Sequence, residues 1–216
     1  MKHVSEFIVL AATKVGDKSL VLHTLSPAWG RRSFITSVSA KAPMALFQPL
    51  SMLEAEVVEN SKSDLWRLKE IRCTAPLHGL RSDLRKSTMS LFLSEVLLRT
   101  IKDGMNEPGL YEWCAGSILT LDAMQSDFSN FHLRFLLELA GRLGFSPSVE
   151  DLLPFAGEHL PVVKQLLTLG GAESMLIPMS GQQRNAVAGL LIDYISFHSE
   201  SVVQIRSLAV LRELFS

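Results

Sequence analysis

The chain has 216 residues, of which 47% are hydrophobic and 20% are charged. This balance excludes an intrinsically disordered chain, and the length allows one large domain or two small ones. No apolar run approaches the roughly 18 residues that cross a bilayer, and Lys14, Asp17 and Lys18 interrupt the N-terminal region before a signal-peptide core can form. We therefore expect a cytoplasmic protein without membrane contact.

The charge is divided unevenly along the chain. Residues 1–102 carry 15 Lys/Arg against 9 Asp/Glu, a net charge of +6, whereas residues 103–216 carry 6 against 13, a net charge of −7. Such a division indicates one end that faces a polyanion and a separate acidic end. The alternative is that the charge of solvated surfaces drifts this far by chance.

The first 76 residues are predicted to form strands. Turn signals such as Lys14–Lys18 and Ser26–Gly30 separate segments rich in β-branched residues, at a regular spacing that predicts a small β-barrel. A linker with two prolines, residues 41–49, interrupts them and could hold a short helical turn. The expected strands are residues 7–13, 20–25, 31–39, 53–57 and 64–73.

Beyond Thr74-Ala-Pro76 the apolar spacing becomes helical, so the predicted fold class is α+β, with a barrel over residues 1–76 and an all-α domain over residues 77–216. The Ser-x-x-Gln spacing at Ser180 is that of a capping box and predicts a helix start there. The expected helices are residues 84–101, 106–121, 131–143, 160–170, 180–194 and 205–215.

The helix that begins at Phe131 is apolar around most of its circumference. Its polar residues fall in one narrow stripe, in which Arg134–Glu138 and Glu138–Arg142 are i,i+4 pairs of opposite charge. Gly144 and Pro147 give a stop signal. We expect this helix to be central, with other helices packed on several sides.

Signals for an enzyme or a metal site are close to absent. The chain has no Walker phosphate loop, no His-Glu-x-x-His and no Gly-x-Ser-x-Gly. Its six histidines are dispersed, and His23 and His132 are expected to be structural. Cys73 and Cys114 form no Cys-x-x-Cys pair, so neither zinc nor a disulfide is expected, and both are predicted to be core residues in a reducing compartment.

Basic residues gather at the turns of the predicted barrel, with Trp29 and Phe34 nearby. Cations neutralise phosphates and aromatic rings stack on bases, so this pattern favours binding of single-stranded nucleic acid. Alternatively, the two aromatic side chains belong to the core and the basic turns only keep edge strands from pairing. The basic turn residues are Lys14, Lys18, Arg31, Arg32 and Lys41.

Five segments, in order along almost the whole chain, resemble the RecO family of bacterial recombination mediators. They are the hairpin of residues 9–21, the Thr24–Gly30 turn, residues 48–54, the helix of residues 133–147 and the last helix, residues 206–214. The resemblance implies an OB-fold barrel followed by a helical domain in a cytoplasmic, nucleoid-associated protein. Many relatives carry four cysteines after the Gly-Phe-Ser-Pro segment; residues 148–157 contain none, so the resemblance implies the zinc-free branch.

The resemblance also implies a function without catalysis and without a cofactor. Such proteins bind single- and double-stranded DNA, anneal complementary strands, contact the acidic tail of single-strand-binding protein, and work with RecR to help load RecA. On this reading the basic turn residues become phosphate contacts, and Arg81, Arg85 and Lys86 at the domain junction extend the path.

Two arginines are the candidates for docking the acidic tail. Arg134 is placed beside an expected apolar groove, with Arg142 on the same stripe, because a peptide that ends in a carboxylate and an aromatic side chain requires an Arg next to such a groove. The alternative for Arg134 is its pair with Glu138. An alternative for the whole protein is a repair scaffold whose barrel binds no DNA.

Overall fold

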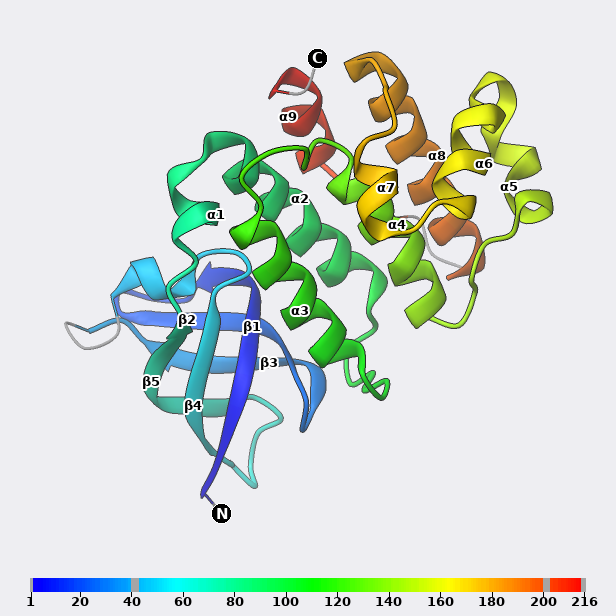
Figure 1. Cartoon of the computed structure of the whole chain (residues 1–216). Coiled ribbons are helices and arrows are strands. Elements are labelled where there is room, and N and C mark those ends of the chain that lie inside the picture. The colour runs from blue at the N-terminus through cyan, green and yellow to red at the C-terminus, as the bar shows by residue number, and fades with distance from the viewer. Residues whose placement is uncertain (1, 40–42, 200–202, 215–216) are drawn as a thin grey trace.

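The computed structural model describes residues 2–39, 43–199 and 203–214. A barrel of five strands at the N-terminal end adjoins a larger body of helices, and the N-terminus lies at the end of the barrel remote from the helices (Figure 1). The predicted fold class, with a barrel of the OB type followed by an all-α part, is confirmed. The strands are β1 Lys2–Lys14, β2 Ser19–Ser26, β3 Gly30–Ser37, β4 Met52–Val58 and β5 Trp66–Ala75.

The strands close in the order β1-β2-β3-β5-β4, and only the short β3–β5 contact is parallel. Alternate side chains fill the barrel, with Phe7, Leu22, Phe34 and Leu53 at its centre. The predicted helical turn in the proline-rich linker is present as a 3₁₀ turn, η1 Met44–Phe47. It buries Phe47 in the barrel core.

A bulge in β5 decides which of its side chains face outward. Glu54 pairs with Arg72 and Glu56 with Lys69, so β5 has one extra residue over this stretch. Glu70 takes up the irregularity with a left-handed φ of 48°. The extra residue returns Ile71 to the barrel core beside Leu68, although three positions separate them.

Within the described residues, the helical part contains the six predicted helices and three that were not predicted. They are α1 His78–Ser82, α2 Leu84–Thr100, α3 Leu110–Ala123, α4 Phe131–Arg142, α5 Val149–Ala156, α6 Leu160–Thr168, α7 Gly171–Met175, α8 Gly181–His198 and α9 Ser207–Leu214, with a 3₁₀ turn, η2 Gly157–His159. Helices α1 and α7 have only five residues each, too few to show a periodic pattern. Helix α5 contains Pro154 but begins with a capping box between Ser148 and Asp151.

The predicted central position of α4 is confirmed. It packs against α3, α7 and α8, and Leu133, Leu136 and Leu139 are fully buried. The capping box predicted at Ser180 is also present, since the Ser180 hydroxyl accepts from the Gln183 N–H and starts α8.

Apart from the core inside the barrel, a second hydrophobic core joins the barrel to the helices. Ile8, Leu10 and Leu25 turn away from the barrel interior and belong to the same buried cluster as the helices, and α2 packs on β1. Gly30 lies so close to the α2–α3 loop that a Cβ there would be 2.0 Å from the Met105 carbonyl oxygen. Only glycine fits this approach, and two backbone hydrogen bonds join Arg31 to Gly104 and Met105.

The prediction that both cysteines are core residues is half right. Cys114 is fully buried on α3, and burial raises the pKa of its thiol. Cys73 is exposed near the end of β5, where Arg72 and Thr74 are exposed as well and strict alternation of buried and exposed residues has ended.

Candidate functional site

The first predicted basic turn joins β1 to β2. Lys14 and Lys18 are both exposed and flank the β1–β2 turn. The Lys18 carbonyl accepts a hydrogen bond from the Val38 N–H at 2.9 Å, which places this turn beside the end of β3. The predicted residue Lys41 lies outside the described residues.

The two arginines at the start of β3 have different surroundings. Arg31 donates to Asp103 of the α2–α3 loop at 3.0 Å, and its side chain is only 17% exposed. Arg32 lies over the ring of Trp66, with 3.7 Å between its Cζ and the ring centroid, and donates to the Asp64 carbonyl at 3.0 Å. Although the two arginines are adjacent in sequence, Arg31 contacts a loop of the helical part and Arg32 contacts side chains and backbone of the barrel.

Two of the three junction residues predicted to extend the DNA path hold the fold together. Lys86 is 3% exposed and donates to the carbonyls of Asp122 and Met124 at the end of α3. Arg81 is half-buried and donates to the Pro49 carbonyl and the Ser51 hydroxyl, both at 3.0 Å, and burial lowers its pKa. A buried, hydrogen-bonded cation is not available to a phosphate, so we correct the assignment of Lys86. Arg85 is exposed.

A basic row on β5 was missed from the sequence. Arg67, Lys69 and Arg72 are all exposed on the outside of the barrel, and within the described residues none of the three forms an ion pair. They line a groove of about 450 Å³ where β3 and β5 diverge, opposite Thr36 and Ser37. Arg67 donates to the Ser37 hydroxyl at 3.4 Å across it. Outward alternation along residues 66–73 could have revealed Arg67 and Lys69, but Arg72 depends on the bulge.

The aromatic residues proposed as stacking faces turn out to be partly structural. Phe34 is fully buried in the barrel core and cannot stack on a base. Trp29 is half-buried and stacks on Phe7, with ring centroids 6.1 Å apart and an interplanar angle of 6°. A further aromatic residue, Trp66, is half-buried at the start of β5.

A second candidate site is an apolar groove of about 560 Å³ between α3, α4 and α7. Its walls include Trp113 of α3, Phe131 and Phe135 of α4, and Met175 of α7, and Arg134 lies among them. Arg134 thus adjoins an apolar groove in the structure. Arg142 is exposed but does not line it.

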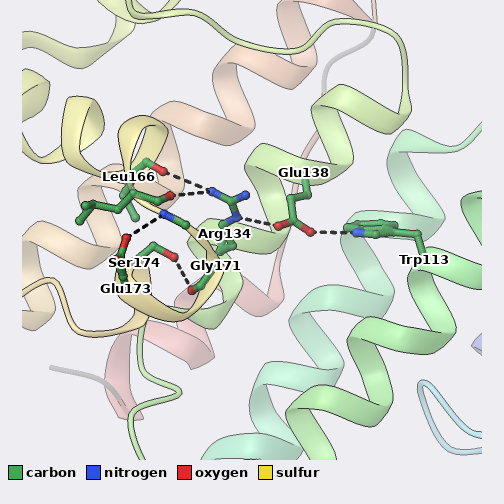
Figure 2. Close-up of polar contacts among 9 residues, drawn as sticks. Trp113, Arg134, Glu138, Leu166, Gly171, Glu173 and Ser174 are labelled. Atoms are coloured by element: carbon green, nitrogen blue, oxygen red, sulfur yellow. Dashed lines mark hydrogen bonds and ion pairs between the residues drawn. The ribbon is translucent and has the colours of Figure 1, made fainter.

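The polar wall of this groove is a chain of hydrogen bonds (Figure 2). Arg134 Nε donates to Glu138 at 2.6 Å, and the Trp113 indole N–H donates to the other oxygen of Glu138 at 2.9 Å. Arg134 also donates to the carbonyls of Leu166 and Leu169, both at 3.4 Å. The predicted Arg134–Glu138 pair is therefore present, and the predicted Glu138–Arg142 pair does not form.

Neither predicted structural histidine lies in a metal site. The described residues contain no group of three or more metal-binding side chains. His23 bonds to the Ser33 hydroxyl, and its pKa is lowered by burial and by the charge of Arg31. Nor does any helix in the described ranges have the length and apolarity to cross a membrane.

The comparisons with known proteins agree with the resemblance. A family model described as the C-terminal part of recombination protein O matches residues 81–153. The chain is 31% identical to the DNA repair protein RecO of Flavobacterium johnsoniae, with all of both chains covered. The chain belongs to the RecO family. RecO proteins of Phocaeicola vulgatus and Bacteroides fragilis are 32% and 30% identical, and 97% and 96% of the present chain is covered. These RecO relatives are all DNA repair proteins by name.

Proposed function

We propose that this protein is a non-enzymatic mediator of DNA repair and recombination, which holds DNA on the barrel and docks protein partners on the helices. The observation that carries the proposal is the basic groove between β3 and β5. Lys18 lies beside its end, and Arg67, Lys69 and Arg72 line it. In OB-folds, nucleic acid lies across strands 2 and 3 and between the loops that follow strands 1 and 4, and Thr36 and Ser37 of β3 line this groove.

Contacts of this kind are made to the phosphate backbone of DNA and do not depend on the base sequence. Lysine and arginine neutralise phosphates and release counterions, so the affinity falls steeply with salt for single-stranded and duplex DNA alike. Lys14 and Arg85 are exposed and extend the set. Annealing follows if binding screens the phosphate repulsion between two strands while most bases stay free to pair.

The groove around Arg134 is proposed to take the acidic C-terminal tail of single-strand-binding protein. Trp113, Phe131 and Phe135 offer an apolar seat for an aromatic side chain, and Arg134 offers charge-assisted hydrogen bonds to a carboxylate. A protein that binds both this tail and DNA brings the two together, so it can help to exchange single-strand-binding protein for RecA in company with RecR.

The test is binding of a labelled single strand and a duplex of equal length across a salt series. We expect the logarithm of the affinity to fall linearly with the logarithm of the salt concentration for both DNAs. In the double variant Lys69→Ala/Arg72→Ala this fall should be less steep by about 1 to 2 in slope, since each phosphate contact contributes about 0.9 to the slope. The matched control is Arg206→Ala/Arg212→Ala, two exposed arginines at the other end of the chain. No binding at low salt would favour the alternative of a repair scaffold without DNA affinity.

A further inference from the structure

A second cavity lies at the junction of the barrel and the helices. It measures about 590 Å³ and is lined by Trp29 and Arg32 from the barrel, Asp64 from the β4–β5 loop, and Asp103 and Asn106 from the α2–α3 loop. Its size falls within the range of about 300–1,000 Å³ that is usual for small-molecule sites. It is separate from the basic groove, with which it shares no lining residue.

The floor of this cavity is a stacked pair of side chains. Arg32 lies over Trp66, and the Asp64 carbonyl holds its guanidinium in place from the side. Trp66 meets Trp29 edge to face, with centroids 6.2 Å apart and an interplanar angle of 89°. Trp29 is itself wedged against Phe7 and Phe34 of the barrel core. The guanidinium is therefore a flat cation fixed in position before any ligand arrives.

The lining of the cavity also includes polar residues, namely Asp64, Asp103 and Asn106. Asp103 keeps acceptor capacity after its pair with Arg31, because a carboxylate accepts about four hydrogen bonds and its side chain is 67% exposed. A flat platform with acceptors around it suits a planar heterocycle that carries N–H donors.

We propose that this cavity holds one unstacked base of a single DNA strand, stacked on the free face of Arg32. Guanidinium planes and aromatic rings are the surfaces on which proteins stack splayed-out bases. The exposed cations Lys62 and Lys102 lie near Asp64 and Asp103 in the chain and can meet the flanking phosphates. This inference rests on the proposed DNA binding and adds to it a contact that a duplex, whose bases are stacked and paired, cannot make.

The experiment compares two single strands of equal length and charge, about 12 nucleotides, within the range that one OB-fold covers. One is deoxycytidine throughout, and the other has abasic residues at its central positions. We expect the intact strand to bind the full-length protein about five- to tenfold more tightly, as one stacked base would give. Arg32→Lys keeps the charge but removes the planar stacking surface. This variant should therefore bind the two strands with equal affinity, so that the ratio of their affinities falls to about 1, and its affinity for the abasic strand should match that of the native protein.

Two controls separate this inference from the proposed function. Lys69→Ala, outside the cavity, should weaken both strands equally and preserve the ratio. Equal binding of both strands by the native protein, or an unchanged ratio in Arg32→Lys, would overturn the base site while leaving DNA binding intact. If neither strand binds at low salt, both the base site and the proposed DNA binding are wrong. A thermal unfolding temperature of Arg32→Lys close to that of the native protein would show that the variant is folded.

Discussion

Arg31 of β3 and Asp103 of the α2–α3 loop form an ion pair at 3.0 Å that joins the barrel to the helices. Asp103 is 67% exposed, whereas only 17% of the Arg31 side chain is exposed. The pair lies beside the backbone hydrogen bonds of Arg31 with Gly104 and Met105. A cation proposed to contact phosphate is thus partly neutralised by the protein itself.

Replacement of Asp103 by Asn should release this cation. We expect Asp103→Asn to bind duplex DNA, which cannot enter the base cavity, a few-fold more tightly at low salt, and to change the free energy of unfolding by less than about 1 kcal/mol. Asp193→Asn on α8, also exposed, makes the same change of net charge as a control. Equal affinities of the two variants in a titration would show that Arg31 lies off the DNA path.

Lys86 and Lys69 should behave as opposites. Lys86→Met leaves the carbonyls of Asp122 and Met124 without their donor, and we expect a loss of about 1–3 kcal/mol in unfolding free energy with unchanged DNA affinity. Lys69→Ala on the exposed face of β5 should alter stability by less than about 0.5 kcal/mol and weaken DNA binding. Denaturant unfolding and DNA titration of both variants measure the contrast. A DNA defect in a stably folded Lys86→Met protein would refute it.

Glu138 competes with the proposed peptide for Arg134. Its carboxylate occupies the guanidinium at 2.6 Å, so an incoming peptide carboxylate must displace or share it. We expect Glu138→Gln to bind an acidic peptide ending in Phe several-fold more tightly, and Arg134→Ala to lose about tenfold or more. Arg142→Ala, exposed and outside the groove, is the matched control. Fluorescence of Trp113 reports binding, and weaker binding by Glu138→Gln would contradict this role.

His132 should make stability depend on pH. It is fully buried on α4 against the edge of Phe92, and burial, with a contribution from the charge of Arg184, lowers its pKa to about 3. Between pH 6.5 and about 3 the unfolded chain takes up a proton that the folded chain does not, so stability falls as the pH falls through this window, by up to about 1.4 kcal/mol per unit.

The comparison variant is His132→Leu, which removes the titrating group. Its unfolding free energy should depend less steeply on pH than that of the native protein between pH 6.5 and 4.5, whatever its absolute stability. His78→Gln, at an exposed position, should keep the native slope. Parallel native and His132→Leu curves in denaturant unfolding would show that His132 is already charged in the fold.

The sequence was a good guide where patterns are local. The helix from Phe131 and the five strands of the barrel follow from apolar periodicity and turn residues, and the capping box at Ser180 lies where its spacing places it. The five-residue helices α1 and α7 were not predicted because a helix of little more than one turn is too short to show a periodic pattern of apolar residues. The outward position of Arg72 was missed because it depends on a bulge, and a bulge, unlike a turn, leaves no mark in residue type.

The candidate sites were harder to predict, since a basic residue in sequence says nothing of what it meets in space. Lys86 and Arg85 are neighbours on one helix, yet one is buried under carbonyls and the other is exposed. Conversely, Arg32 and Trp66 come from separate strands and meet only because β3 and β5 run side by side. Contacts of this kind depend on which strands lie side by side, and local patterns in a single sequence do not show the order of strands in a sheet.

Helix α2 touches both ends of the chain, since it packs on β1 and on α9, whose start is held by the carboxylate of Glu95. On the ribosome, α2 is therefore complete long before one of its partners exists. The side of α2 that packs on α9 stays exposed to solvent while more than a hundred further residues are synthesised. Surface exposed in this way during synthesis is the kind that chaperones bind.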